Sequence, residues 1–357
     1  MDNLLTVSKV FSDRIFRVPD YQRGYAWEER QCWDFLEDLE LLAPDKEHFF
    51  GLLILHRLVG DGAKVLDQRG QAYNEFHVVD GQQRLTTIVL LLDAIRREMV
   101  RYPSLGLMAQ GIEETYVQMY DLNGQPVSKL RLNRDTHDYF FGTVLERAKD
   151  IDGPTIRSQL LLAQAKKLLA TYLNKTRGDL GDSYPSWLKD QYIKVAQQLT
   201  FVVYTVDSEA DAGVVFETMN NRGKALTELE KAKNYLLYLS SKLDLPAQND
   251  LSADVCDTWT HIFEHLMTAG LSTESDEDRL LRAHWLMAYD YDRRKWKGSR
   301  TIKKRFNMKR YHAKHPALLE DLKDYLSTLR NATIACCDVC NPSHPNAFAV
   351  YNPDKER

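Results

Sequence analysis

No apolar run in the 357-residue sequence approaches the roughly 20 residues that a bilayer-spanning helix needs. The first residues carry no basic segment ahead of a continuous apolar core, so they predict no signal peptide. Five cysteines, an odd number in a long chain, argue against a disulfide framework and favour a reducing compartment. Glycine and proline are scarce, and no internal repeat is found. These absences predict a soluble cytoplasmic protein of two or three folded units.

Acidic residues are missing from one long stretch, residues 293–315, which we call the basic segment. It contains eleven lysines or arginines, whereas the remaining 334 residues carry a net charge of −15. This asymmetry predicts a localised contact with a polyanion, and the candidate DNA-binding cations are Lys303, Lys304 and Arg305. A solvated face that balances the acidic body, or a contact with another domain, is the alternative interpretation.

The rest of the chain is organised around residues 76–95, with the sequence FHVVDGQQRLTTIVLLLDAI. Phe76, Val78 and Val79 form a short apolar run typical of a buried strand. The following Asp-Gly pair interrupts this run, and the apolar residues after it recur at helical spacing. The stretch therefore predicts a strand, a tight turn and a helix, with the DGQQR sequence at residues 80–84 spanning the turn.

The predicted turn has residues suited to a phosphate. The first N–H groups of a helix have no partner inside the helix and attract anions. Arg84 adds a planar guanidinium that suits phosphate oxygens. Asp80, at the end of the strand, can hold a divalent metal or a water molecule. An ordinary Asp-Gly turn with solvated Gln82, Gln83 and Arg84 side chains is the alternative.

A second motif, residues 16–27 (FRVPDYQRGYAW), gathers aromatic, amide and guanidinium groups on one loop. Such a loop can stack a nucleobase and clamp a phosphate. For the two aromatic residues at its end, packing over a sheet explains the sequence equally well. The candidate DNA-binding residues of this loop are Tyr21, Gln22, Arg23, Tyr25 and Trp27.

A third motif contains a polar, positively charged turn after a predicted helix at 209–219. Thr227 and Glu230 form the pattern of a capping box that starts the next helix. The turn can close over the phosphates or base of a nucleotide held at residues 80–84. A helix connector with a glycine C-cap is the alternative. The turn residues are Asn220, Asn221, Arg222, Gly223 and Lys224.

Other stretches predict scaffold. Residues 5–16 read as a short amphipathic helix, and residues 49–57 and 198–208 read as strands. In the helix predicted at 29–42, the side chains expected on the core face are Trp33, Leu36, Leu39 and Leu42.

Two groups resemble zinc sites. HIFEH at 261–265 fits a core helix better. The group of Cys336, Cys337, Cys340 and His344 fits structural zinc poorly, and its cysteines read as small residues of a terminal helix.

Taken in their order along the chain, the motifs resemble the N-terminal domain of GmrSD-type modification-dependent restriction endonucleases. SspE- and BrxU-like phage-defence nucleases belong to the same group. The resemblance rests on DGQQRLTT, on FRVPDYQRGYAW and on VFETMNNRGKALTELEKAKNYLL at 215–237. Lesser matches are FFGLLILHR at 49–57 and KLRLNRD at 129–135.

The resemblance implies an α/β fold with a small ParB/sulfiredoxin-like sheet core in a larger, mostly helical body. The expected core comprises residues 1–104 and 197–238, and residues 105–196 form a helical insertion. Residues 239–357 form a helical region with the basic segment. Relatives commonly continue into an HNH nuclease domain, so we expect this chain to be the front part of a longer protein.

The resemblance also implies an NTPase, with GTP favoured and Mg²⁺ or Mn²⁺ required, that senses modified DNA and controls the nuclease. Phosphorothioate DNA is one expected target. The expected catalytic residues are Asp80, Gln82, Gln83 and Arg84, and Asp80 is also the expected metal ligand. The nucleotide is expected to bind at Gly81, Arg84, Thr86 and the 220–224 turn. Two alternatives remain: a DNA-recognition module that binds a nucleotide without hydrolysis, and a metal-dependent DNA-nicking domain.

Overall fold

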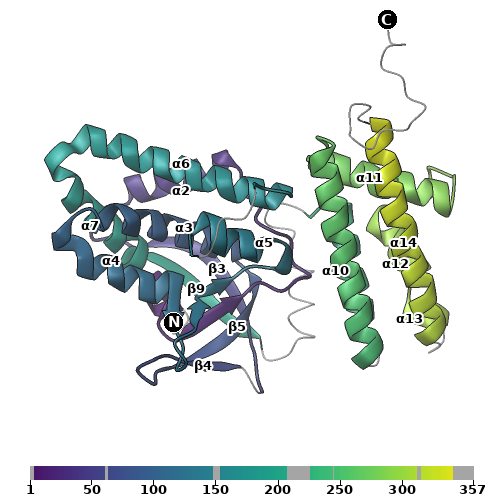
Figure 1. Cartoon of the computed structure of the whole chain (residues 1–357), viewed down its shortest axis with the longest axis horizontal. Helices are drawn as coiled ribbons and strands as arrows, with labels where there is room; N and C mark the ends of the chain where they lie inside the picture. Colours follow the sequence, from purple (N-terminus) through teal and green to yellow (C-terminus); the bar gives the residue numbers. More distant parts are fainter. Residues whose placement is uncertain are drawn as a thin grey trace, which may run out of the picture. The chain divides into compact units, whose positions relative to one another are not determined.

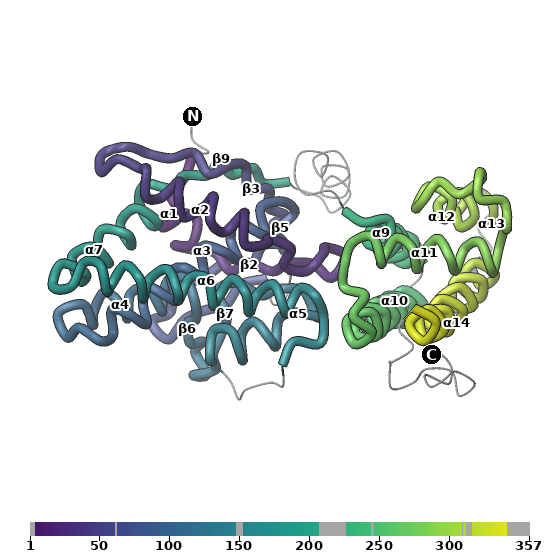
Figure 2. Tube along the Cα trace, turned by 90° about the horizontal axis from the view of Figure 1, so that it is seen from above, coloured from purple at the N-terminus to yellow at the C-terminus, as the bar shows by residue number. Residues whose placement is uncertain are grey.

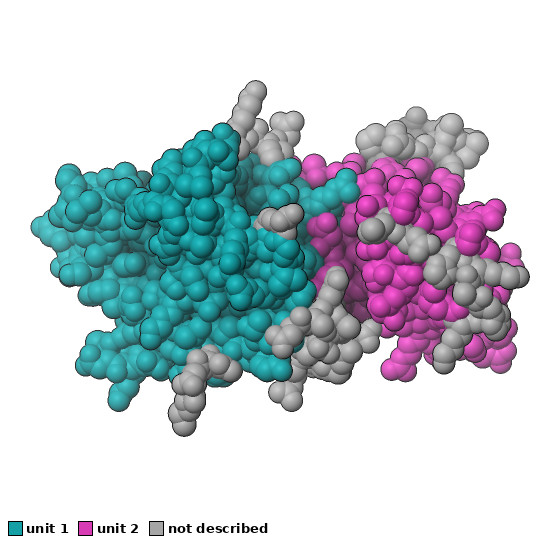
Figure 3. Space-filling model, turned by 90° about the horizontal axis from the view of Figure 1, so that it is seen from below, with its two compact units in different colours: residues 1–19, 24–152, 158–224 teal, residues 20–23, 153–157, 225–357 magenta. Residues whose placement is uncertain are grey.

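The chain divides into two units, which Figure 3 distinguishes by colour. The computed structural model describes residues 4–60, 63–147, 153–206, 226–243, 245–311 and 315–340. We call the first unit, residues 1–19, 24–152 and 158–224, the sheet unit. The second, residues 20–23, 153–157 and 225–357, is the helical unit.

A mixed seven-stranded sheet forms the centre of the sheet unit, so the fold is α/β (Figure 1). Its strand order is β1-β9-β3-β5-β2-β8, and β4 pairs with β5 beside this path. β9 runs antiparallel to β1 and parallel to β3, whereas β3 and β5 are antiparallel. The strands are β1 (Leu4–Thr6), β2 (Arg14–Arg17), β3 (His48–Arg57), β4 (Lys64–Leu66), β5 (Ala72–Asp80), β8 (Leu130–Arg131) and β9 (Leu199–Val206).

Helices cover one face of this sheet (Figures 1 and 2). Their apolar side chains fill a single large core. Leu53 and Leu55 of β3 and Val78 of β5 point into this core, while Ile54 and Val79 belong to a small cluster outside it. This alternation follows from the two-residue period of a strand. The helices are α1 (Val7–Phe11), α2 (Glu29–Leu41), α3 (Gln82–Met99), α4 (Gly106–Ile112), α5 (Arg134–Tyr139), α6 (Arg157–Leu180) and α7 (Tyr184–Ile193), and a separate hairpin consists of β6 (Gln118–Tyr120) and β7 (Pro126–Ser128).

Helix α3 is held by packing along most of its length and by ion pairs near its end. Leu85, Ile88 and Leu92 are fully buried in the core. Asp93 is also buried, and its two oxygens accept hydrogen bonds from Arg96, Arg97 and Arg147 at 2.8–3.0 Å. Buried carboxylates persist when they are paired in this way. The helix therefore fixes the turn that precedes it.

The strand predicted at 198–208 is confirmed as β9, but two other expectations were wrong. Residues 5–16 contain two strands around the short helix α1, because β1 pairs with β9 and β2 with β5. These long-range ladders override the local helical pattern. Trp33 is 43% exposed rather than buried, because Cys32 and Phe35 join Leu36 and Leu39 on the core face of α2.

The helical unit has its own apolar core. α10 and α14 pack along each other, and α9, α11 and α12 complete the core around the fully buried Trp259 and Tyr325. No helix in the described part of the chain is long and apolar enough to cross a membrane. The helices are α9 (Glu228–Ser240), α10 (Leu245–Thr268), α11 (Glu274–Ala288), α12 (Ser299–Arg305), α13 (Met308–Tyr311) and α14 (His315–Cys340).

Candidate functional site

The DGQQR sequence forms the strand–turn–helix that the sequence predicts. β5 ends at Asp80, and α3 begins at Gln82. Gly81 between them has φ of 101°, a conformation that side chains with a Cβ rarely adopt. A Cβ at this position would also lie 2.8 Å from Cδ1 of Leu53. Glycine is therefore required here on two grounds, and it directs the first N–H groups of α3 to the end of β5.

Arg84 lies across this turn and is 22% exposed. Its Nη1 donates to the carbonyl of Phe50, and its Nη2 donates to Oδ2 of Asp80, both at 3.2 Å. Burial lowers the pKa of Arg84, and the Asp80 carboxylate opposes that change. The ion pair was not foreseen from the sequence. It holds the guanidinium in one orientation beside the N-terminus of α3.

Gly51 is a site residue that the sequence interpretation missed. It sits at an irregularity of β3, with φ of 128°. A Cβ here would lie 1.8 Å from Nη1 of Arg84, so any larger residue would displace the guanidinium. A glycine inside a strand signals a close approach of this kind, and Gly51 within the motif FFGLLILHR was that signal.

Asp80 is the one carboxylate of the DGQQR turn, and its side chain is 40% exposed. Oδ2 accepts from Arg84, whereas Oδ1 has no hydrogen-bond partner among the described residues. A single accessible carboxylate suits Mg²⁺, which is commonly bound through one or two carboxylates and the phosphates of a nucleotide. Nowhere in the described ranges do three or more His, Cys, Asp or Glu side chains gather as a metal-binding group. The donor set therefore fits a metal that arrives with a nucleotide.

The two glutamines of the turn differ in their contacts. The side chain of Gln83 accepts from the amide of Ala26 at 2.8 Å and donates to the carbonyl of Gly24 at 3.0 Å. Gln82 is partly exposed, and its amide group makes no hydrogen bond within the described part of the chain. Gln83 thus holds the 24–26 segment, and Gln82 is available for a ligand.

Thr86 is buried and uses its hydroxyl inside the helix. The hydroxyl donates to the carbonyl of Gln82 at 2.8 Å, and the residue is 2% exposed. The structure therefore places Thr86 within α3 rather than at the surface of the turn.

The two aromatic residues at the end of the 16–27 motif pack into the core. Tyr25 is 4% exposed, and its hydroxyl lies 2.9 Å from that of Thr87. Trp27 packs against Phe35 and Phe50. These contacts agree with the packing alternative: the Tyr25 ring is buried, and the Trp27 ring is partly buried.

The other three residues of that motif belong to the helical unit. Gln22 is buried, while Tyr21 and Arg23 are partly exposed. Burial raises the pKa of Glu230, and the charge of Arg23 partly opposes the rise. Arg23 is therefore part of a charged cluster around the start of α9.

The start of α9 is a capping box, as the sequence predicts. The Thr227 hydroxyl accepts from the amide of Glu230, whose carboxylate accepts from the amide of Thr227. The turn residues 220–224 and the preceding helix predicted at 209–219 lie outside the described residues.

The basic segment is less free than its sequence indicates. Arg305 donates to Asp321 and to the hydroxyl of Tyr311 at 3.2 and 2.8 Å. The amine of Lys303 lies 5.3 Å from the centre of the Tyr235 ring. Lys304 is exposed and has no ion-pair partner among the described residues. Of the three candidate cations, Lys304 is the one presented fully to solvent.

The model of the family described as GmrSD restriction endonuclease, N-terminal domain, matches residues 7–237. This range holds every strand of the sheet except β1, together with the DGQQR turn and the start of α9. No curated protein matches the chain.

Proposed function

Because the chain belongs to the family of GmrSD restriction endonuclease N-terminal domains, we propose that its DGQQR turn binds and hydrolyses a nucleoside triphosphate. GTP is the favoured substrate. Hydrolysis serves to sense modified DNA, of which phosphorothioate DNA is one candidate, and to control a nuclease domain. In the same proposal the sheet core is of the ParB/sulfiredoxin type.

The observation that carries the proposal is the fixed guanidinium of Arg84 beside the first amides of α3. Phosphoryl transfer requires positioning and charge neutralisation more than covalent chemistry by the protein. A guanidinium already held by Asp80 and the Phe50 carbonyl loses little freedom when a phosphate binds. The helix amides add further donors at the same point.

Gln82 orients the attacking water in this proposal, because its amide is available while that of Gln83 is occupied by Gly24 and Ala26. Asp80, one of whose oxygens accepts from Arg84, would hold a divalent metal, which would supply neutralisation of the phosphate charge. The DNA contact is assigned to Tyr21, Arg23 and the exposed cations of the basic segment, and Tyr25 and Trp27 are left to the core.

Replacing Arg84 tests the proposal. We expect Arg84→Ala to lower NTP hydrolysis at least 100-fold, because removal of one positioned donor to a reacting group costs about that much. Phosphate release from GTP, ATP, CTP and UTP is measured for the wild type and the variant. Arg30→Ala is a matched control, since Arg30 is an exposed arginine of the same unit with only a 3.9 Å pair to Asp34.

Thermal unfolding of each variant shows whether the fold is kept. Hydrolysis at the wild-type rate in a folded Arg84→Ala protein overturns the phosphate role. Nucleotide binding without hydrolysis in the wild type favours the recognition module instead. Metal-dependent nicking of a plasmid by the wild type, unchanged by nucleotide, favours the nicking domain.

A further inference from the structure

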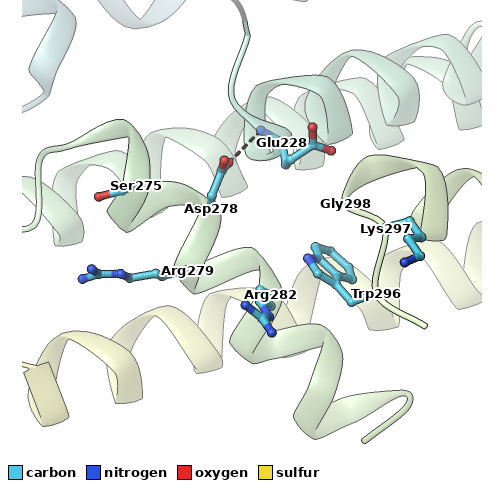
Figure 4. Close-up of a pocket in the computed structure, with 8 residues that line it drawn as sticks. All are labelled: Glu228, Ser275, Asp278, Arg279, Arg282, Trp296, Lys297 and Gly298. Atoms are coloured by element: carbon cyan, nitrogen blue, oxygen red, sulfur yellow. Dashed lines mark hydrogen bonds between the residues drawn. The ribbon is translucent and has the colours of Figure 1, made fainter. Parts of the chain in front are cut away.

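A second candidate site lies in the helical unit, far along the chain from the DGQQR turn. A cavity of about 490 Å³ opens between α11, the start of α9 and the loop before α12 (Figure 4). That volume is within the range of small-ligand sites. Its lining residues are Glu228, Ser275, Asp278, Arg279, Arg282, Trp296, Lys297 and Gly298.

The two acidic residues of the cavity accept hydrogen bonds from the backbone amides at the first residues of α9 and α12. Glu228 accepts from the amide of Ser299 at 2.5 Å and from the amine of Lys231 at 2.7 Å. Burial raises the pKa of Glu228, but these hydrogen bonds outweigh burial and lower the pKa below its ordinary value. Asp278 accepts from the amide of Glu228 at 2.7 Å. Glu228 is thus paired with a cation, whereas Asp278 accepts from a neutral backbone amide.

The backbone conformation at Gly298 allows the loop before α12 to approach Glu228 closely. Gly298 has φ of 63°, and a Cβ on it would lie 2.0 Å from Oε2 of Glu228. Only glycine lets the loop approach the carboxylate so closely.

The cations of the cavity are compensated less completely. Arg282 and Lys297 are exposed, and neither side chain has an ion-pair partner in the part of the chain that the structure describes. Arg279, one turn before Arg282 on α11, is 3.5 Å from Asp276. With three cations and two carboxylates among its lining residues, the cavity has an excess of positive charge.

Trp296 adds an aromatic surface among these cations. It is partly buried, and its ring centre lies 5.9 Å from that of Trp285. Its indole N–H donates no hydrogen bond among the described residues. An exposed part of an indole ring beside free guanidinium and ammonium groups suits a base and the phosphate attached to it.

We propose that this cavity binds a nucleotide unit, with the base stacked on Trp296 and the phosphate between Arg282 and Lys297. The unit comes either from a free mononucleotide or from a single-stranded segment of DNA. The second source rests on the proposed DNA-sensing function, whereas the first does not. The site is separate from the DGQQR turn in sequence and in its side chains.

Two ligands and two pocket variants test this site in the whole chain. Fluorescein-labelled oligothymidylate and unlabelled deoxynucleoside monophosphates are titrated into the wild type, Trp296→Leu and the double variant Arg282→Gln with Lys297→Gln. We expect roughly tenfold weaker binding for each pocket variant, the size of one lost stacking or charge-assisted contact. Lys323→Gln is the matched control, because Lys323 is an exposed cation outside the basic segment that does not line the cavity.

The results separate the two sources and can overturn the site. Pocket-dependent binding of monophosphates as tight as that of the oligonucleotide identifies a free nucleotide. Pocket-dependent binding of the oligonucleotide alone identifies a DNA strand. Affinities within twofold of the wild type in both pocket variants overturn the proposal. The effect of the pocket variants on binding tests this site alone, whereas hydrolysis by Arg84→Ala tests the NTPase proposal, so either proposal can fail while the other stands.

Discussion

At the scale of single residues, the contacts of the DGQQR turn distinguish Gln82 from Gln83, which look equivalent in the sequence. Gln83 is bonded at both ends of its amide, to Gly24 and Ala26, and Gln82 is not. Only contacts made across almost 60 residues distinguish them, so no local pattern could assign their roles. One glutamine supports the loop, and the other is available for the proposed nucleotide.

Replacing each glutamine by alanine is expected to give opposite results. Gln82→Ala keeps the wild-type stability and nucleotide affinity but lowers the hydrolysis rate, because the water loses its orienting group. Gln83→Ala lowers the free energy of unfolding by roughly 1–3 kcal/mol, because two backbone groups lose their partner. Urea unfolding and single-turnover hydrolysis measure the two effects. Equal loss of stability in both variants contradicts the assignment.

Glu277 in the helical unit is a buried carboxyl group whose protonation is linked to folding. Burial, with the nearby Glu230 and Glu274 carboxylates, raises the pKa of Glu277 to about 8, and the Thr227 hydroxyl and Arg157 oppose the rise. The folded protein therefore holds a proton that the unfolded chain releases near its ordinary value of 4.5. The stability linked to this group is fully present below pH 4.5 and is lost as pH rises through 8.

Glu277→Gln is expected to remove that pH dependence while keeping an oxygen for the Thr227 hydroxyl, which donates to Glu277 at 2.8 Å. The variant should become more stable relative to the wild type as pH rises from 5 to 8.5. Urea titrations at both pH values measure the difference, with the exposed Asp250→Asn as control. A constant difference between variant and wild type would contradict the linkage.

At the scale of elements, α12 shows how a charge count in the sequence overstates the available charge. The basic segment itself contains no acid, but Arg305 is paired with Asp321 of α14. Arg294 and Lys295 are paired with Asp292 and Asp290, just before the segment. Such partners are visible only after the helices have packed.

The salt dependence of DNA binding measures how many cations of the basic segment are available to DNA phosphates. We expect neutralising Arg300 and Lys304, both exposed on α12, to flatten the slope of log K against log[salt] by about two units if each contacts a phosphate. The pair Arg294→Gln and Lys295→Gln, whose charges are ion-paired with Asp292 and Asp290, serves as control and is expected to flatten the slope less. An unchanged slope in the first pair, with DNA still bound, places the DNA contact on other residues.

At the scale of the whole molecule, the sequence predicts the elements around the site better than the contacts between them. The strand–turn–helix at 76–95, the strand at 198–208 and the capping box at Thr227 all follow from local patterns. The strands β1 and β2 do not, because three- and four-residue strands exist only through their partners in the sheet. The closeness of Gly51 to Arg84 joins residues 33 positions apart, which no local period reveals.

The position of β9 has a consequence for how the chain is made. β9 lies between β1 and β3, although more than 140 residues separate it from β3 in the sequence. As the chain leaves the ribosome, β1 and one edge of β3 therefore remain unpaired until residue 206 has emerged. Unpaired strand edges are the usual starting points of aggregation, and such distant pairings form slowly. Synthesis of the sheet unit thus has a long vulnerable interval, during which the amphipathic helices made in between are the available cover for the core.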